Sequence, residues 1–166
     1  MNTLSKERLP EVFASLITAS LKRQKLELSQ PAEEYVVSVV SDLSAVAHQL
    51  APRSIIVVDL LRKGLNSDGY VRSSYLRVAG DVALFVSGIF PDSLESRKIC
   101  FTLGDYIAIG QQAYGNIRVE VFDELSMKFP EVVTMLNTVS EEIDLLSRDI
   151  QRYIRRRRNI DGLSRR

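Results

Sequence analysis

The residue whose surroundings look most like a chemical site is Asp81, an acid inside the apolar segment GDVALFVSGIFPDSL (80–94). A carboxylate among apolar side chains must be paired, hydrogen-bonded or protonated. Arg77 lies one helical turn earlier, and Tyr106 and Tyr114 follow on the next apolar segment. We interpret these four residues as a buried polar network that fixes helix register. The functional alternative is an acid that faces a small-molecule pocket, regulatory or enzymatic.

The second chemical feature is the basic C-terminal end of the chain. Residues 148–166 carry eight arginines against two aspartates, a net charge of +6, which leaves −5 on the other 147 residues because the total is +1. Cations at a helix C-terminus interact favourably with the helix dipole, which is the structural interpretation. The alternative is an acidic partner: nucleic acid, an anionic lipid surface or an acidic protein face. The arginines concerned are Arg152, Arg155, Arg156, Arg157 and Arg158.

The sequence lacks the other patterns that carry catalysis or metal binding. It has one histidine, His48, and one cysteine, Cys100, whereas a zinc site needs several such ligands. Paired Glu-x-x-His motifs, phosphate-binding glycine loops and a Gly-x-Ser-x-Gly elbow are also missing. We therefore expect no catalytic residue, no cofactor and no metal, and we favour a protein that is not an enzyme.

Helical periodicity, with apolar residues three and four apart, runs through almost the whole chain. Ser29 followed by Pro31 marks one helix start, because serine caps free N–H groups and proline fits the first turn. The run IIVV (55–58) also suits a strand, but no partner strand is evident, so we prefer a short helix capped by Ser54. The expected helices span approximately residues 9–25, 29–51, 54–64, 71–90, 103–125 and 129–158.

Small residues recur in the two most apolar of these helices. Glycine inside a helix costs about 0.5–1 kcal/mol relative to alanine, so a compensating contact is needed. We expect a close antiparallel pair of helices between Val71 and Leu125, with its turn set by Pro91, at the centre of the molecule. The small residues are Ala79, Gly80, Ala83, Ser87 and Gly88 in the first helix, and Gly104, Ala108, Gly110, Ala113 and Gly115 in the second.

The last helix has the most regular pattern in the chain. Its apolar residues alternate spacings of four and three, the a/d pattern of a helix seam. The simpler interpretation is an amphipathic helix that lies on its own bundle; the alternative is that part of the seam meets the same helix of a second subunit. The flanking positions offer no full set of opposite charges, which argues against a free-standing zipper. The seam residues are Val132, Leu136, Val139, Ile143, Leu146, Ile150 and Tyr153.

The two apolar helices also resemble a core seen in a group of uncharacterised bacterial proteins. That core has a Gly-Asp pair, a Leu-Phe pair and Gly-x-Phe-Pro, followed by a tyrosine, a glycine and an Ala-Tyr pair. The resemblance covers about a quarter of the chain. It implies a helical bacterial protein and brings no activity, ligand or catalytic residue. The matching residues are Gly80, Asp81, Leu84, Phe85, Gly88, Phe90, Pro91, Tyr106, Gly110, Ala113 and Tyr114.

The sequence as a whole predicts an all-α, single-domain bundle of five or six helices with a long C-terminal amphipathic helix. The domain is expected over 1–158, with a short basic tail at 159–166. Composition, 45% hydrophobic and 26% charged, suits a soluble globular chain, no apolar run reaches the roughly 20 residues that span a bilayer, and a single cysteine favours the cytoplasm. We expect a homodimeric interaction protein; the alternatives are an accessory protein that binds nucleic acid or anionic membrane through its basic end, and a small-molecule pocket at Asp81.

Overall fold

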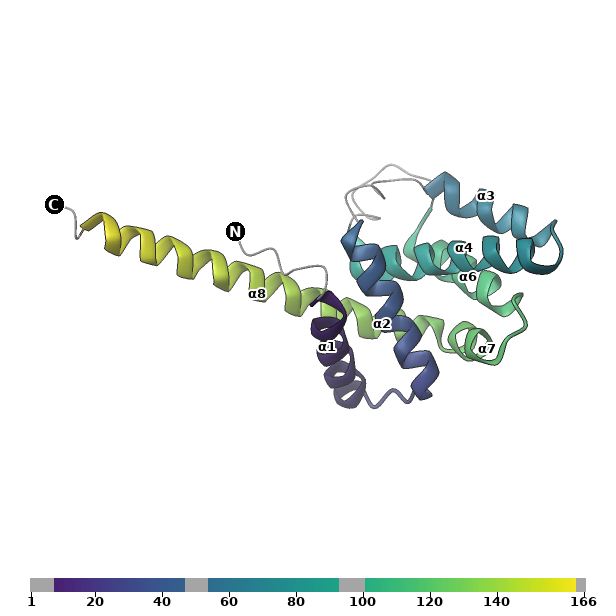
Figure 1. Ribbon diagram of the computed structural model, residues 1–166, viewed down its shortest axis with the longest axis horizontal. Coiled ribbons are helices and arrows are strands. Elements are labelled where there is room, and N and C mark those ends of the chain that lie inside the picture. The colour runs from purple at the N-terminus through teal and green to yellow at the C-terminus, as the bar shows by residue number, and fades with distance from the viewer. Residues whose placement is uncertain (1–7, 47–53, 93–100, 164–166) are drawn as a thin grey trace.

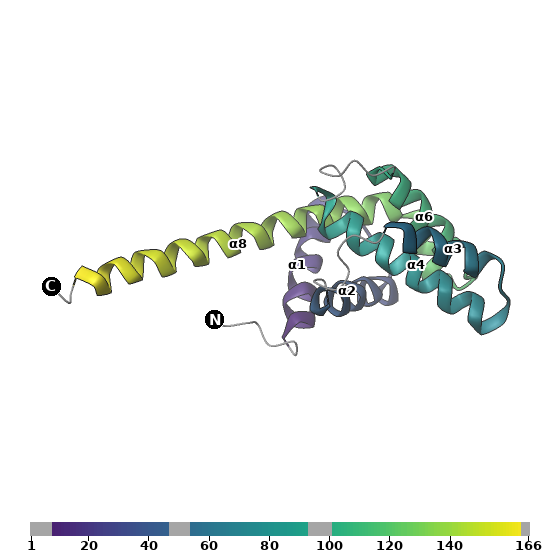
Figure 2. The ribbon, with the colours of Figure 1, turned by 90° about the horizontal axis from the view of Figure 1, so that it is seen from above.

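The computed structural model describes residues 8–46, 54–92 and 101–163, and its regular structure in these ranges is entirely helical (Figures 1 and 2). The all-α fold is confirmed, with seven helices in the described ranges where five or six were expected. They are α1 (Leu9–Gln24), α2 (Gln30–Ala45), α3 (Ser54–Leu65), α4 (Gly69–Ile89), α6 (Leu103–Gly115), α7 (Glu120–Met127) and α8 (Phe129–Leu163).

Local sequence signals set the ends of several helices. Ser29 Oγ accepts a hydrogen bond from the Ala32 N–H at 3.3 Å, which caps α2 as expected. A capping box starts α6: Thr102 Oγ1 accepts from the Asp105 N–H, and the Asp105 carboxylate accepts from the Thr102 N–H. α1 ends at Lys25, whose φ of 53° is left-handed and cannot continue a helix.

The single helix expected over 103–125 is wrong, because the chain breaks between α6 and α7. Arg118, inside the break, has a φ of 66°, which lies outside the right-handed helical region. α7 then packs back against α6, where Ser126 Oγ donates to the Gln111 carbonyl at 2.7 Å and Gln111 Nε2 donates to the Ser126 carbonyl at 3.2 Å. The break therefore turns one predicted helix into two packed ones.

The centre of the bundle is α4, which packs against α3, α6 and α8. Leu76 and Ala79 of α4 are buried together with Ala113 near the end of α6, so the start of one helix lies beside the end of the other. The expected central hairpin is therefore present, although α6 is shorter than expected. α1 and α2 add their apolar faces to the larger core, which includes Ile17 and Val36.

Glycines of the hairpin form recesses for large side chains of α8. A Cβ atom added to Gly88 would lie 2.7 Å from Leu136 Cδ1, and one added to Gly110 would lie 2.0 Å from Phe129 Cζ. We expected these glycines to bring the backbones of α4 and α6 together. In the structure, Gly88 and Gly110 instead leave room for side chains from a third helix. Through these contacts α8 packs against the hairpin.

α8 also closes the C-terminal end of α4. Asn137 Nδ2 donates to the carbonyls of Ser87 and Gly88 at 2.9 and 2.7 Å, and Ser140 Oγ donates to the Ile89 carbonyl at 2.6 Å. The last carbonyls of a helix have no partner within that helix. Side chains of α8 therefore donate hydrogen bonds to the carbonyls at the end of α4, which have no partner within α4.

We expect Asn137→Ala to lower the free energy of unfolding by about 1–2 kcal/mol, because two partly buried carbonyls lose their donor. Thr134→Ala is the matched control, since the exposed Thr134 hydroxyl donates only to the Pro130 carbonyl of its own helix. The control should stay within about 0.5 kcal/mol of the parent protein. Urea unfolding measures both variants, and equal small losses would contradict the capping role.

α8 has two parts, an attached half (129–143) and a projecting half (144–163). The attached half ends where Arg23 of α1 forms an ion pair with Glu142. Beyond this point, both views show the helix running away from the body (Figures 1 and 2). The projecting half contains 20 residues, which make a helix about 30 Å long at 1.5 Å per residue. Leu145, at its start, is 58% exposed.

Candidate functional site

Asp81 of α4 lies between two tyrosine hydroxyls from other helices. Tyr35 of α2 and Tyr114 of α6 each donate a hydrogen bond to Asp81 Oδ1 at 2.7 Å. The two rings meet edge to face, with centroids 6.2 Å apart. The buried Tyr114 ring fills a recess at Gly80, where an added Cβ would lie 2.3 Å from Tyr114 Cε1. Asp81 Oδ1 therefore connects α2, α4 and α6 through two hydrogen bonds.

Burial has the largest influence on protonation in this network. It raises the pKa of Asp81, although the two tyrosine hydrogen bonds and the charge of Arg77 act in the opposite direction. Burial, and after it the negative charge of Asp81, also raises the pKa of Tyr35 and of Tyr114 above the usual value for tyrosine. The two hydroxyls therefore stay protonated and remain donors at neutral pH.

We expect Tyr35 and Tyr114 to keep their protons in the folded protein at a pH where exposed tyrosines ionise. Because their pKa is raised by folding, the stability that they contribute is complete below the unfolded value of about 10 and is lost as the pH rises above it. Phenolate absorbance should therefore show a late step that coincides with alkaline unfolding.

The double variant Tyr35→Phe/Tyr114→Phe should lose that late step. Tyr70→Phe, a substitution at an 84% exposed position outside the network, is the matched control and should keep the late step. Ionisation of every tyrosine near pH 10 without unfolding would contradict the network.

The structure brings together part of the polar set that the sequence suggested. Asp81 and Tyr114 are in direct contact. Arg77 is exposed, and no ion pair joins it to Asp81. Tyr106 is buried in the main core. The residue that sequence reasoning missed is Tyr35, and the available signal was its place four residues before Val39, on the apolar side of α2.

The predicted dimer seam lies in two different environments. Val132, Leu136 and Val139 are fully buried in the protein's own core, and Ile143 packs against that core. The attached half therefore follows the simpler interpretation, in which the helix lies on its own bundle. The other three seam positions belong to the projecting half. Those positions, whose side chains lie outside the described part of the structure, are Leu146, Ile150 and Tyr153.

The arginines of the basic end also belong to the projecting half. Arg152, Arg155 and Arg156 are exposed, while the side chains of Arg157 and Arg158 lie outside the described part. α8 continues to Leu163, so the helix takes in most of the stretch 159–166 that was expected as a tail. Consecutive residues of a helix point in different directions, so the run does not form a single basic face.

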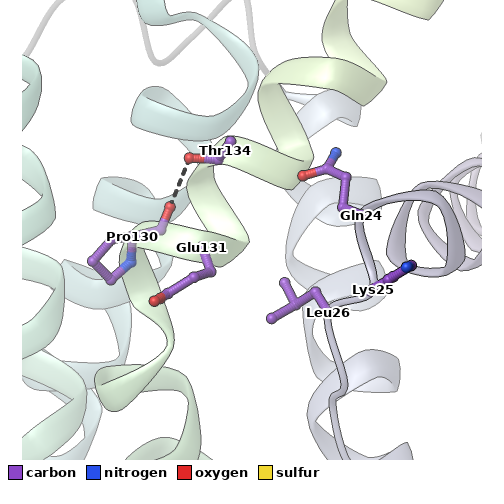
Figure 3. A pocket seen from close by; sticks show the side chains of 6 residues that line it. All are labelled: Gln24, Lys25, Leu26, Pro130, Glu131 and Thr134. Carbon is purple, nitrogen blue, oxygen red and sulfur yellow. Dashed lines mark hydrogen bonds between the residues drawn. The ribbon is translucent and has the colours of Figure 1, made fainter.

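A surface groove of about 350 Å³ lies between the end of α1 and the attached half of α8 (Figure 3). Figure 3 shows Leu26 and Glu131 on facing sides of it. The groove does not include Asp81, so a small-molecule pocket at Asp81 stays a prediction. The lining residues are Gln24, Lys25, Leu26, Pro130, Glu131 and Thr134.

No family model, curated protein or solved structure matches this chain. Within residues 8–46, 54–92 and 101–163, no three acidic, histidine or cysteine side chains gather closely enough to hold a metal ion. No helix in the same ranges combines the length and apolarity needed to cross a membrane. Function must therefore be inferred from the contacts and charges of the chain itself, above all from those of α8.

Proposed function

We propose that this protein is a non-enzymatic, cytoplasmic interaction protein that forms a homodimer through the projecting half of α8. In this proposal the helical body is the rigid base that holds and orients the helix. The Asp81 network belongs to the base, because two tyrosine hydroxyls from other helices donate to Asp81 Oδ1 and join three helices.

The observation that carries the proposal is the change of environment along one continuous seam. At Val132, Leu136 and Val139 the a/d residues are completely buried by the protein's own core. The same spacing continues through Leu146 and Ile150, where the helix has left the body. An a/d seam that continues beyond its own bundle matches the pattern by which helices bind other helices.

The energetics of a projecting helix also favour a partner. Helices without tertiary contacts are marginal in water, and most helix stability in proteins comes from packing an apolar face. The four consecutive arginines at 155–158 add repulsion between like charges. Burying a leucine or isoleucine side chain stabilises a protein by about 1.5–3 kcal/mol. A second helix packed on the seam therefore supplies the apolar burial that the projecting half lacks.

The test is the mass of the full-length protein in solution as a function of concentration, measured by sedimentation equilibrium. We expect a monomer–dimer equilibrium at micromolar concentrations, and Leu146→Lys should weaken it by more than about tenfold, because a charge enters the seam. Leu145→Lys is the matched control, since Leu145 lies one residue away, outside the seam, and is exposed. A protein that stays monomeric, or a dimer that both variants leave unchanged, would contradict the proposal.

A second function is favoured by the exposure of Arg152, Arg155 and Arg156 at the far end of the projecting half. We propose, as the alternative, that these arginines bind the phosphates of nucleic acid or of anionic lipids without sequence specificity. Titration of a labelled oligonucleotide and co-sedimentation with phosphatidylserine vesicles test it. Binding should weaken steeply with salt, and the absence of binding to both at low salt would contradict it.

A further inference from the structure

We infer that Arg152, Arg155 and Arg156 form a stripe on one side of the projecting half, the basic stripe, and that this stripe docks on the phosphate backbone of a nucleic acid duplex. The inference rests on the second proposed function, phosphate binding by the basic end. It adds the side of α8 that binds and the class of polyanion that is bound. The positions of the charges around and along the helix lead to it.

The three exposed arginines lie on one side of α8. Successive residues of a helix are rotated by about 100°, so positions 152, 155 and 156 fall within about 100° of one another around the axis. Arg157 and Arg158 occupy other sides, because their positions follow Arg156 by about 100° and 200°. The run of four arginines therefore surrounds the helix, but its first two members share a side with Arg152.

The basic stripe lies on the opposite side of α8 from the residues that the body buries. Val132, Leu136 and Val139 are fully buried. Helical geometry places them about 150–170° around the axis from the centre of the basic stripe. The a/d seam continues along that buried side. A second helix on the seam therefore leaves the basic stripe open, so dimerisation and phosphate binding are compatible.

The three arginines are available to an anion from outside the chain. All three are exposed, and within the described ranges no acidic side chain forms an ion pair with any of them. A guanidinium group is always charged in proteins and binds phosphate oxygens through two parallel N–H groups. A row of three such groups suits a polyanion that repeats its phosphates.

The acids of α8 favour a duplex over a membrane as that polyanion. Glu141 and Asp144 are exposed, and their positions lie on or next to the side of the basic stripe, nearer to the body. They precede Arg152 by about 16 and 12 Å along the axis. An anionic membrane is flat and would meet these acids together with the stripe. A duplex is a convex rod that touches a crossing helix over a short length, and charges 12 Å away are largely screened at physiological ionic strength.

The basic stripe also lacks the aromatic residues that single strands require. Proteins that bind single strands without sequence preference stack the bases on aromatic side chains. The one aromatic residue of the projecting half is Tyr153, whose position is among those of the seam. It lies about 100° around the axis from Arg152. The stripe therefore offers contacts to phosphates alone, which fits a duplex bound without base readout.

The test compares two variants that remove the same charge from different sides of the helix. Arg152→Gln/Arg156→Gln removes two arginines of the basic stripe, and Arg157→Gln/Arg158→Gln is the matched control. Fluorescence anisotropy measures binding of the full-length proteins to a labelled DNA duplex of mixed sequence over a salt series. The slope of log affinity against log salt should become shallower by about 2 in the stripe variant and by less than about 1 in the control. At low salt the stripe variant should bind at least about tenfold more weakly.

The outcomes separate the inference from the function on which it rests. A stripe variant that is weakened more than the control supports the inference, with circular dichroism to show that both variants are folded. Equal losses overturn the basic stripe, while phosphate binding by the basic end stands. Tighter binding to phosphatidylserine vesicles or to a single-stranded oligonucleotide, at equal phosphate concentration, overturns the choice of a duplex. No binding to any of the three at low salt overturns both.

Discussion

Gly110→Ala is expected to lower the free energy of unfolding by about 2–3 kcal/mol or to prevent folding, although alanine is the better helix former by about 1 kcal/mol. The added methyl group would lie 2.0 Å from Phe129 Cζ. Phe129 is fully buried and packs against Tyr114, with ring centroids 5.8 Å apart, so it has no free space into which to move. The start of α8 would be pushed off the α4–α6 hairpin.

Gly104→Ala is the matched control for this effect. Gly104 lies in the first turn of the same helix, and the nearest atom to its added Cβ is Thr102 Oγ1 at 3.6 Å, an ordinary contact distance. This substitution should be neutral or stabilise by a few tenths of a kcal/mol. Thermal and urea unfolding measure both variants, and equal effects at the two positions would show that the recess at Gly110 is not needed.

Asp81→Leu is expected to destabilise the protein by about 2–4 kcal/mol at neutral pH, because two tyrosine hydroxyls lose their shared acceptor. Tyr114 is fully buried, so its hydroxyl cannot form a hydrogen bond with solvent instead. Asp81→Asn keeps an acceptor oxygen at nearly the same place and should cost much less. Urea unfolding of the two variants gives the comparison, and a loss as large for asparagine as for leucine would contradict the network geometry.

The pH dependence of the same site follows from the direction of its pKa shift. Folding raises the pKa of Asp81 because burial disfavours the charged form. The folded state therefore holds its proton more tightly than the unfolded state, whose carboxyl has a pKa of about 4. Stability should fall as the pH rises from about 4 through the raised pKa, and Asp81→Asn should remove that part of the dependence. A decrease of equal size in both proteins would contradict the assignment.

The helical fold could be predicted from the sequence because apolar spacing and end signals agree along most of the chain. Ser29 illustrates this, since a serine before Gln-Pro specifies a helix start by chemistry that needs no tertiary contact. The break at Arg118 was missed because Gly115, the last residue of α6, was interpreted as a small residue inside one long helix, and helical spacing resumes directly afterwards in α7.

The candidate site shows the same limit. Asp81 stood out as an acid among apolar residues, but Tyr35 lies 46 positions earlier in the sequence, and no local pattern connects the two. The seam of α8 was visible as a repeat, yet a/d spacing is identical whether the partner is the protein's own core or another chain. Only the three-dimensional fold shows that Val139 is buried in the protein's own core and that α8 then runs away from the body.

The most direct test of the α8 pairing is the distance between spin labels on the two copies of a dimer. With Cys100→Ser as background, labels are placed at Leu145→Cys or Arg155→Cys, two exposed positions of the projecting half. In a homodimer joined through the projecting halves of α8, the labels on the two copies come close enough for a distance to be measured, whereas labels on separate monomers do not. We predict a distance between copies at both positions, and Leu146→Lys should remove it. No distance between copies at either position would contradict the homodimer.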